Sequence, residues 1–212
     1  MTDKLMERIC GVILAGGASS RMGAEKAFSA LSGRPMIAHV IKRLAPQVDQ
    51  LVISANGAPA RFAAFGLPVL ADPIEDPDTE RQGPLAGLLA ALRYAKAEGF
   101  AALVTAPADA PFLPANLVIR LCAARGSHHL VCLARSAGGL EPLFGLWRTA
   151  ALAGAETAFV HGERAMHRLA ASLGYAEAAF TSEGDAIGFA NVNSPTELEE
   201  ARRRLSADPF VG

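Results

Sequence analysis

The chain has 212 residues, of which 51% are hydrophobic and 19% are charged, and its net charge at pH 7 is −1. A chain of this length can bury a substantial core without disulfides. The composition excludes a disordered chain, and it excludes a nucleic-acid-binding protein that relies on bulk positive charge. An anionic ligand must therefore be bound by a local site and not by the field of the whole protein.

Cysteine content and charge spacing bear on the compartment. The three cysteines match neither a disulfide framework nor a zinc pattern, so we expect buried free thiols in a reducing compartment. The longest stretch without a charged residue runs from Ile9 to Ser20, which is shorter than the about 20 residues of a membrane helix. Asp3 and Glu7 are also unlike the positive start of a signal peptide. These features predict a cytoplasmic protein without a membrane segment.

The first predicted element is a continuous apolar run over residues 9–15. Continuous apolarity indicates a strand that is covered on both faces, as in a parallel sheet. Pro35 occupies a favoured first helical position, and the apolar residues after it fall on one helical face. Further strands are predicted at residues 51–55, 68–70, 101–105, 130–133 and 143–147.

Helical segments alternate with these strands. They are predicted after Pro84, from about Pro114 to Arg125, and over residues 166–173 before Gly174. The last helix is signalled by Ser194 as N-cap, Pro195 as first helical residue and Glu197 in a capping box. This alternation predicts one α/β domain with a mostly parallel sheet, in which ligands bind beyond the carboxyl ends of the strands.

A loop of small residues, 16–26, follows the first predicted strand. Its glycines allow backbone N–H groups to turn inward and form a nest for an anion. Arg21 and Lys26 would add charge-assisted hydrogen bonds to phosphate oxygens. The loop has neither a Walker A pattern nor the G-x-G-x-x-G fingerprint. It is therefore predicted to bind phosphate in another way, the alternative being an ordinary flexible loop.

Polar residues also follow the next two predicted strands. Asn56 and Asp72 are each weak signals alone, because both residue types are common in turns. Gly83 and Gly87 flank the start of the following helix, where they would permit close approach of a flat ligand. Asn191, before the last helix, fits a ligand contact and a turn equally well.

Asp109 follows the fourth predicted strand, in a loop stiffened by prolines. A rigidly held carboxylate at a strand end suits Mg²⁺, which is usually bound by one or two carboxylates and by substrate phosphates. The alternative role is helix capping.

Residues Leu14 to Lys26 resemble the L-A-G-G-x-S-x-R-M-G-x-D-K signature of nucleotidyltransferases, with Glu25 where that pattern usually has Asp. Three further segments narrow the resemblance: residues 83–87, 109–113 and 191–198. Together they resemble the molybdenum cofactor guanylyltransferases, over about residues 9–205.

The resemblance implies a Rossmann-like three-layer α/β/α fold in a single domain, with nucleotide binding at about residues 9–115 and acceptor binding at about 116–205. It implies transfer of GMP from GTP to the terminal phosphate of molybdopterin carrying molybdenum, with Mg²⁺ as cofactor and pyrophosphate as the second product. Transient contact with cofactor-biosynthesis proteins is implied by the family alone. We expect a monomer, since nothing in the sequence resembles a coiled coil.

The resemblance also implies site residues. GTP contacts fall on Leu14, Ala15, Gly16, Lys26, Asn56, Asp72 and Asp109. Asp109 would also hold the metal, while Lys26 and Arg21 balance charge on the leaving pyrophosphate. Either Asp72 or the loop of Gly83, Pro84, Leu85 and Gly87 would read the base. Arg164 and Asn191 are candidates for binding the acceptor.

Three alternatives remain open. Cytidylyl transfer to the same pterin is disfavoured by the Gly-Pro-Leu-Ala-Gly segment at residues 83–87. Transfer to a sugar or polyol phosphate is disfavoured by the Asn-Val-Asn segment at residues 191–193. A nucleotide-binding module without catalysis is suggested by Glu25 alone, and the presence of Lys26 and Asp109 argues against it.

Overall fold

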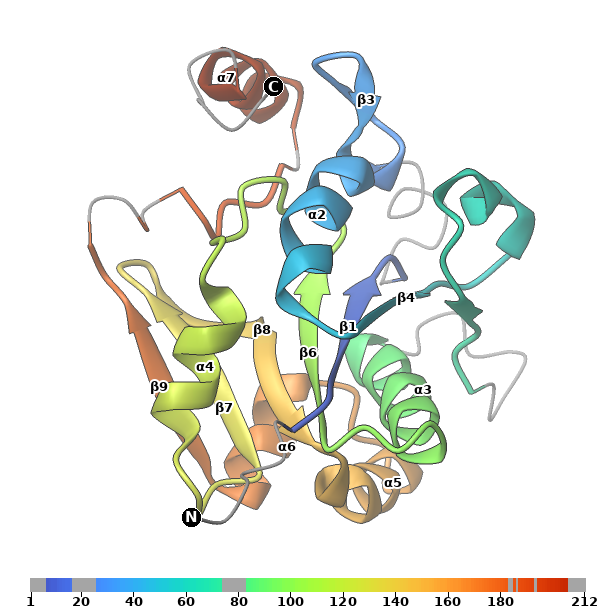
Figure 1. Cartoon of the computed structure of the whole chain (residues 1–212), viewed down its shortest axis with the longest axis vertical. Coiled ribbons are helices and arrows are strands. Elements are labelled where there is room, and N and C mark those ends of the chain that lie inside the picture. Colours follow the sequence, from blue (N-terminus) through green and yellow to red (C-terminus); the bar gives the residue numbers. More distant parts are fainter. Residues whose placement is uncertain are drawn as a thin grey trace.

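The computed structural model describes residues 7–16, 26–73, 83–182, 185, 187–192 and 194–205. Its main sheet has seven strands in the order β5-β4-β1-β6-β8-β7-β9 (Figure 1). These strands are β1 (Ile9–Leu14), β4 (Gln50–Ser54), β5 (Val69–Leu70), β6 (Ala102–Pro107), β7 (Val131–Ser136), β8 (Gly139–Arg148) and β9 (Tyr175–Phe180). Strand β8 runs antiparallel to its neighbours β6 and β7, and the other neighbouring pairs are parallel.

Helices cover both faces of the sheet. Helices α2 (Met36–Leu44) and α4 (Leu117–Arg125) pack on one face, and α3 (Gly83–Ala97), α5 (Leu152–Val160) and α6 (Met166–Leu173) pack on the other. A short hairpin of β2 (Ala30–Leu31) and β3 (Arg34–Pro35) packs with α7 (Pro195–Leu205). Short 3-10 helices occupy Ala45–Gln47, Pro59–Phe65 and Thr149–Ala151. The mostly parallel α/β fold predicted from the sequence is confirmed.

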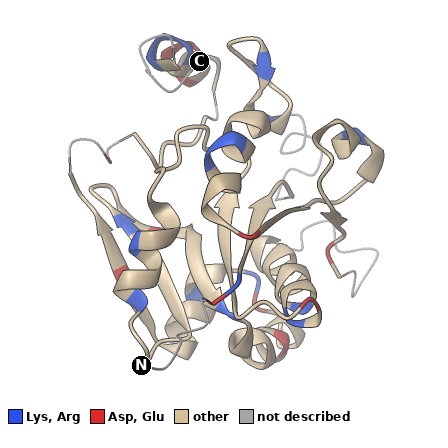
Figure 2. Ribbon diagram, viewed as in Figure 1, with Lys and Arg blue, Asp and Glu red and all other residues tan. Residues whose placement is uncertain are grey.

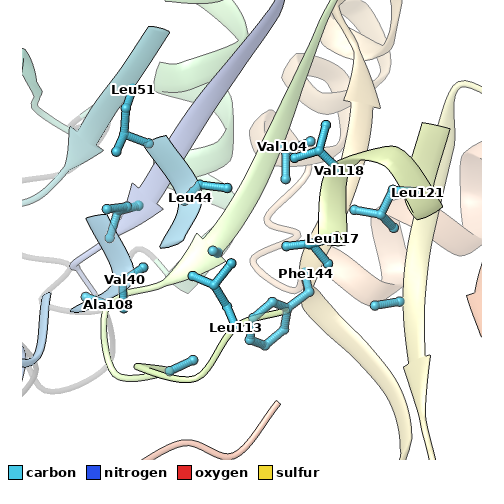
Figure 3. Close-up of a cluster of buried hydrophobic side chains, with 14 of the residues drawn as sticks. Val40, Leu44, Leu51, Val104, Ala108, Leu113, Leu117, Val118, Leu121 and Phe144 are labelled. Atoms are coloured by element: carbon cyan, nitrogen blue, oxygen red, sulfur yellow. The ribbon is translucent and has the colours of Figure 1, made fainter. Parts of the chain in front are cut away.

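Two apolar cores lie on opposite faces of the sheet, and β1 contributes to both. Ile13 belongs to the core under α2 and α4, whereas its neighbours Val12 and Leu14 belong to the core under α3, α5 and α6. This double burial explains the continuous apolar run in the sequence. Figure 3 shows the first core, where Leu44 of α2 and Leu117 of α4 lie over the sheet.

The distribution of charged residues agrees with the net charge of −1. Basic and acidic residues are interspersed over the described ribbon (Figure 2). None of the helices in the described residues is long and apolar enough to cross a membrane.

Two helix starts differ from the prediction. Pro35 lies in β3 with an extended ψ of 143°, so α2 begins one residue later than predicted, at Met36. Helix α4 begins at Leu117 and not near Pro114, because the Leu117 N–H closes a turn onto the Pro114 carbonyl at 3.1 Å. The sequence reading also omitted α5, β9 and the β2–β3 hairpin.

The start of α7 matches its prediction. The Ser194 N–H donates to Glu197 Oε2 at 2.9 Å, and the Glu197 N–H donates to Ser194 Oγ at 3.2 Å. These reciprocal bonds form a capping box.

Candidate active site

The carboxyl ends of β1, β4 and β6 form one continuous edge. Beyond the ends of these strands, the Ala15 N–H donates to the Ser54 carbonyl at 2.8 Å, and the Ala108 N–H donates to the Leu14 carbonyl at 3.1 Å. The loops that carry the predicted site residues therefore begin side by side, at strand ends that are hydrogen-bonded to one another.

Asp72 and Asn56, predicted separately, form one hydrogen-bonded group. Asp72 is only 7% exposed. The Asn56 Nδ2 donates to Asp72 Oδ2 at 2.9 Å, and the Ser54 Oγ donates to Asp72 Oδ1 at 2.9 Å. Burial raises the pKa of the Asp72 carboxyl, and the hydrogen bonds from Ser54 and Asn56 partly offset that rise. Ser54 was missed by the sequence reading.

Gly16 brings the end of β1 against this carboxylate. A β-carbon on Gly16 would lie 3.5 Å from Asp72 Oδ2. The following loop residues, 17–25, lie outside the described residues, and with them Arg21 and Glu25. Of the residues predicted to bind phosphate, the structure therefore places Gly16 and Lys26.

Asp109 follows β6 and is half-buried. Burial raises the pKa of its carboxyl, while its own backbone N–H and the positive charge of Lys26 lower it. Its main-chain carbonyl accepts the Val192 N–H at 2.9 Å. This hydrogen bond places the segment before α7 beside the Asp109 loop. The neighbouring Asn191 is exposed.

The donor set around Asp109 fits a metal that is bound mainly through its substrate. Among the described residues, no group of three or more His, Cys, Asp or Glu side chains is arranged to hold a metal ion. A single carboxylate cannot form an all-protein cage, but Mg²⁺ commonly takes one or two carboxylates and completes its shell with water and substrate phosphates. Asp109 is compatible with that mode.

The start of α3 contacts a distant segment of the chain. Gly83 has φ +67°, and a β-carbon there would lie 2.7 Å from the Arg164 carbonyl oxygen. That carbonyl accepts the Leu85 N–H at 3.2 Å, and the Leu85 side chain is buried. A β-carbon on Gly87 would lie 2.6 Å from Ser54 Oγ. The absence of a side chain at Gly87 thus leaves room for Ser54 Oγ.

A cavity of about 450 Å³ lies beside this contact. It is lined by Gly83 and Pro84 of α3, by Pro142 and Leu143 of β8, and by residues 162–168. Because β8 runs antiparallel to β6, its first half lies beyond the carboxyl end of β6. The structure therefore brings two predicted groups together in one cavity, the Gly83–Pro84 loop and Arg164.

Arg164 has local structural contacts as well. Its Nη1 donates to the carbonyls of Phe159 at 2.8 Å and Glu163 at 2.9 Å, and the guanidinium carbon lies 4.2 Å from the centroid of the Phe159 ring. Arg164 thus lines the cavity while holding the C-terminal end of α5.

Comparison with known proteins places these features in a family. The family description "MobA-like NTP transferase domain" matches residues 11–178. A protein named molybdenum cofactor guanylyltransferase from Cereibacter sphaeroides is 46% identical over 95% of this chain and 99% of its own length. One of the same name from Rhodobacter capsulatus is 45% identical over 93% of this chain and 97% of its own.

Solved structures share the fold. Molybdopterin-guanine dinucleotide biosynthesis protein A from Archaeoglobus fulgidus matches with a TM-score of 0.71 and 22% identity, over 94% of this chain and 100% of its own. A 4-diphosphocytidyl-2C-methyl-D-erythritol synthase from Anaerococcus prevotii matches with a TM-score of 0.66 and 10% identity, over 94% of this chain and 96% of its own. The fold alone therefore does not indicate which nucleotide the protein uses. The sequence matches are more specific than the fold, and they show that the chain belongs to the MobA-like NTP transferase family.

Proposed function

We propose that the protein is a molybdenum cofactor guanylyltransferase. It transfers GMP from GTP to the terminal phosphate of molybdopterin carrying molybdenum, forming molybdopterin guanine dinucleotide and pyrophosphate. The observation that carries this proposal is the 46% identity, over 95% of the chain, with a relative of that name. The grouping of Gly16, Asn56, Asp72 and Asp109 along one sheet edge is consistent with it.

The proposed reaction requires that the substrates be positioned, and it does not require a general base. A phosphate monoester is largely dianionic at pH 7, because its second pKa is about 6. One of its oxygens forms a bond to the α-phosphorus of GTP, the bond from that phosphorus to the bridging oxygen breaks, and pyrophosphate leaves. In this proposal Lys26 and Arg21 balance the charge that develops on the leaving group.

We assign the metal to Asp109. Its carboxylate, half-buried beside the charge of Lys26, would hold Mg²⁺ together with phosphates of the substrate. When bound, Mg²⁺ supplies charge neutralisation on the triphosphate.

The nucleotide and the acceptor are assigned to neighbouring regions. Leu14, Ala15 and Gly16, together with Lys26, Asn56 and Asp72, would bind GTP along the edge formed by β1, β4 and β5. The cavity lined by Gly83, Pro84 and Arg164 would take the base or the acceptor, with Asn191 near the acceptor. Binding of nucleotide by residues 9–115 and of acceptor by residues 116–205 stays a prediction, as do a monomeric state and a cytoplasmic location.

Thermal unfolding with Mg²⁺ and each nucleoside triphosphate in turn tests which nucleobase the protein recognises. A ligand at 100 times its Kd stabilises the folded state by about 2.7 kcal/mol, which for a domain of this size raises the Tm by several degrees. We expect this shift for GTP. A shift for CTP alone would assign the protein to cytidylyl transfer, and GTP binding without pyrophosphate release in the presence of molybdopterin would indicate a non-catalytic module.

A further inference from the structure

Ser54 is the last residue of β4, and the proposed function gives it no role. It is only 1% exposed, yet its hydroxyl has a polar partner, because Oγ donates to Asp72 Oδ1 at 2.9 Å. The second carboxylate oxygen accepts Asn56 Nδ2 at 2.9 Å, and the Asp72 N–H returns a hydrogen bond to Asn56 Oδ1 at 3.3 Å. Each oxygen of Asp72 thus has its own donor, and the carboxylate is held against rotation.

The two donors leave part of the carboxylate available. An ionised carboxyl accepts at about four lone-pair positions, two on each oxygen. With one position on each oxygen taken, each oxygen can still accept one more hydrogen bond. A ligand with two adjacent donors matches that arrangement. A nucleoside has such pairs at the guanine N1–H and amino group, and at the cis-diol of the ribose.

The packing around Ser54 keeps its hydroxyl on Asp72. Helix α3 approaches β4 so closely that a β-carbon on Gly87 would lie 2.6 Å from Ser54 Oγ and 3.1 Å from Leu14 Cδ2. The Ser54 side chain is therefore confined between the helix and the carboxylate. On the other side of the carboxylate, Gly16 has no side chain to cover Asp72 Oδ2.

We propose that Ser54 is a positioning residue that, together with Asn56, orients the Asp72 carboxylate to accept a pair of adjacent donors from the nucleoside part of the substrate. This inference rests on the proposed function, because it requires a nucleotide at the β1–β4 edge. It adds a determinant of nucleoside affinity that acts through Asp72 and does not touch the phosphates.

The test is calorimetric binding by the full chain with Mg²⁺ present. The ligands are GTP and inorganic tripolyphosphate, which has the phosphates but no nucleoside. Ser54→Ala should weaken GTP binding about tenfold, since hydrogen bonds to charged groups are strong and the remaining carboxylate is less well held. Its affinity for tripolyphosphate should equal that of the wild type. If Ser54→Ala does not fold, Ser54→Cys keeps a side chain of similar shape with a weak donor, and should show the same selective loss.

Thr105→Val is the matched control. Thr105 is also a buried hydroxyl in the sheet, but it bonds to the main chain of Gly145 in the neighbouring strand. Its loss should lower the Tm without changing the ratio of GTP affinity to tripolyphosphate affinity. Equal weakening of GTP binding in Ser54→Ala and Thr105→Val, or equal loss of both ligands in Ser54→Ala, would overturn the positioning role.

Two analogues identify the donor pair. dGTP lacks one ribose hydroxyl, and ITP lacks the amino group of guanine. The analogue that lacks one of the donors to Asp72 should bind the wild type more weakly than GTP does. Ser54→Ala should not weaken the binding of that analogue further. If neither analogue shows this, the donor-pair inference is wrong. If the wild type binds no GTP at all, the proposed function fails instead, which distinguishes the two failures.

Discussion

The main-chain carbonyl of Asp109 accepts a hydrogen bond from the N–H of Val192 at 2.9 Å. These residues are far apart in the sequence, so the bond joins the segment before α7 to the loop that carries the proposed metal ligand. Val192 is buried with Leu31, Ala201 and Leu205, in a cluster that ties α7 to the hairpin following Lys26. The C-terminal helix thereby supports two segments of the proposed active site.

Ser194→Ala tests the contribution of α7 to stability. Loss of the hydroxyl removes the hydrogen bond that Ser194 Oγ accepts from the Glu197 N–H, and such capping losses typically cost about 1 kcal/mol. We expect a decrease of that size in the free energy of unfolding, measured with urea. Ser172→Ala is the control, because Ser172 lies within α6 and its hydroxyl bonds to the Leu169 carbonyl of its own helix. A loss as large in the control would contradict a specific role of the cap.

Asp109→Asn should abolish most Mg²⁺-dependent turnover. The amide has nearly the same size as the carboxylate but no negative charge for the cation, so the fold should persist while metal binding weakens. Pyrophosphate release, measured against Mg²⁺ concentration, checks this.

Glu156→Gln serves as the control for Asp109→Asn. It also neutralises a carboxylate, but Glu156 lies in α5 and pairs with Arg93 at 3.0 Å, both exposed. Its turnover should match that of the wild type. Near-normal turnover of Asp109→Asn at low Mg²⁺ would remove Asp109 from the metal site.

Lys26→Ala should lower kcat/KM more than tenfold. A tenfold loss corresponds to about 1.4 kcal/mol of transition-state stabilisation, a modest value for a cation facing a leaving pyrophosphate. Steady-state kinetics with GTP measure the change, and Lys42→Ala on the exposed face of α2 provides a control for loss of one positive charge. Unchanged kinetics in Lys26→Ala would place Lys26 outside the phosphate site.

Most of the sheet could be predicted from the sequence, because buried parallel strands are continuous apolar runs. Residues 9–15 and 101–105 carry that signal clearly and correspond to β1 and β6. Strand β9, by contrast, reads Tyr-Ala-Glu-Ala-Ala-Phe and pairs with β7 alone. It lacks β-branched residues, and its alanines are equally compatible with a helix, so only the tertiary pairing determines its conformation.

The site residues were predictable where a polar residue follows a predicted strand, as at Asn56 and Asp72. Ser54 carried no such signal, since it lies within the strand predicted at residues 51–55 and its role depends on a side chain 18 positions away. The cavity beside Arg164 was also not predictable, because Pro142 and Leu143 reach it only through the reversed direction of β8. Both features depend on contacts between distant segments.

Burial should make two of the cysteines unreactive in the folded protein. Burial raises the pKa of Cys10 and of Cys132 to about 12, whereas Cys122 is only half-buried. The thiolate is the reactive form, so iodoacetamide at pH 8 should label Cys122 first and the other two only after unfolding. Mass spectrometry of the labelled peptides measures the order, and rapid native labelling of Cys10 would contradict it.

The same thiols make stability depend on pH. Above the ordinary thiol pKa of 9.0, the unfolded chain releases the proton of Cys10 while the folded chain keeps it. The unfolded state then binds fewer protons, so the free energy of unfolding should fall as the pH rises past that value. In Cys10→Ala this dependence should be shallower than in the wild type. An unchanged slope in urea unfolding between pH 8 and pH 10 would show that Cys10 does not contribute.

Gly87→Ala should destabilise the protein even though alanine is the better helix former. The exchange favours a helix by about 1 kcal/mol where there is space, but here the methyl group would lie 2.6 Å from Ser54 Oγ and 3.1 Å from Leu14 Cδ2. Overpacking of this kind typically costs about 1–3 kcal/mol, so we expect a net loss of stability in urea unfolding. Displacement of Ser54 should also weaken GTP binding, because the hydrogen bond to Asp72 is then disturbed.

Gly154→Ala is the matched helical glycine. A β-carbon there would lie 2.7 Å from Leu173 Cδ2, the far end of a flexible side chain that can move aside. This variant should therefore be close to neutral in stability and should bind GTP like the wild type. If Gly87→Ala were as stable as Gly154→Ala and kept its GTP affinity, the close packing of α3 on β4 would not hold Ser54 in place, and the orientation of Asp72 would have to depend on Asn56 alone.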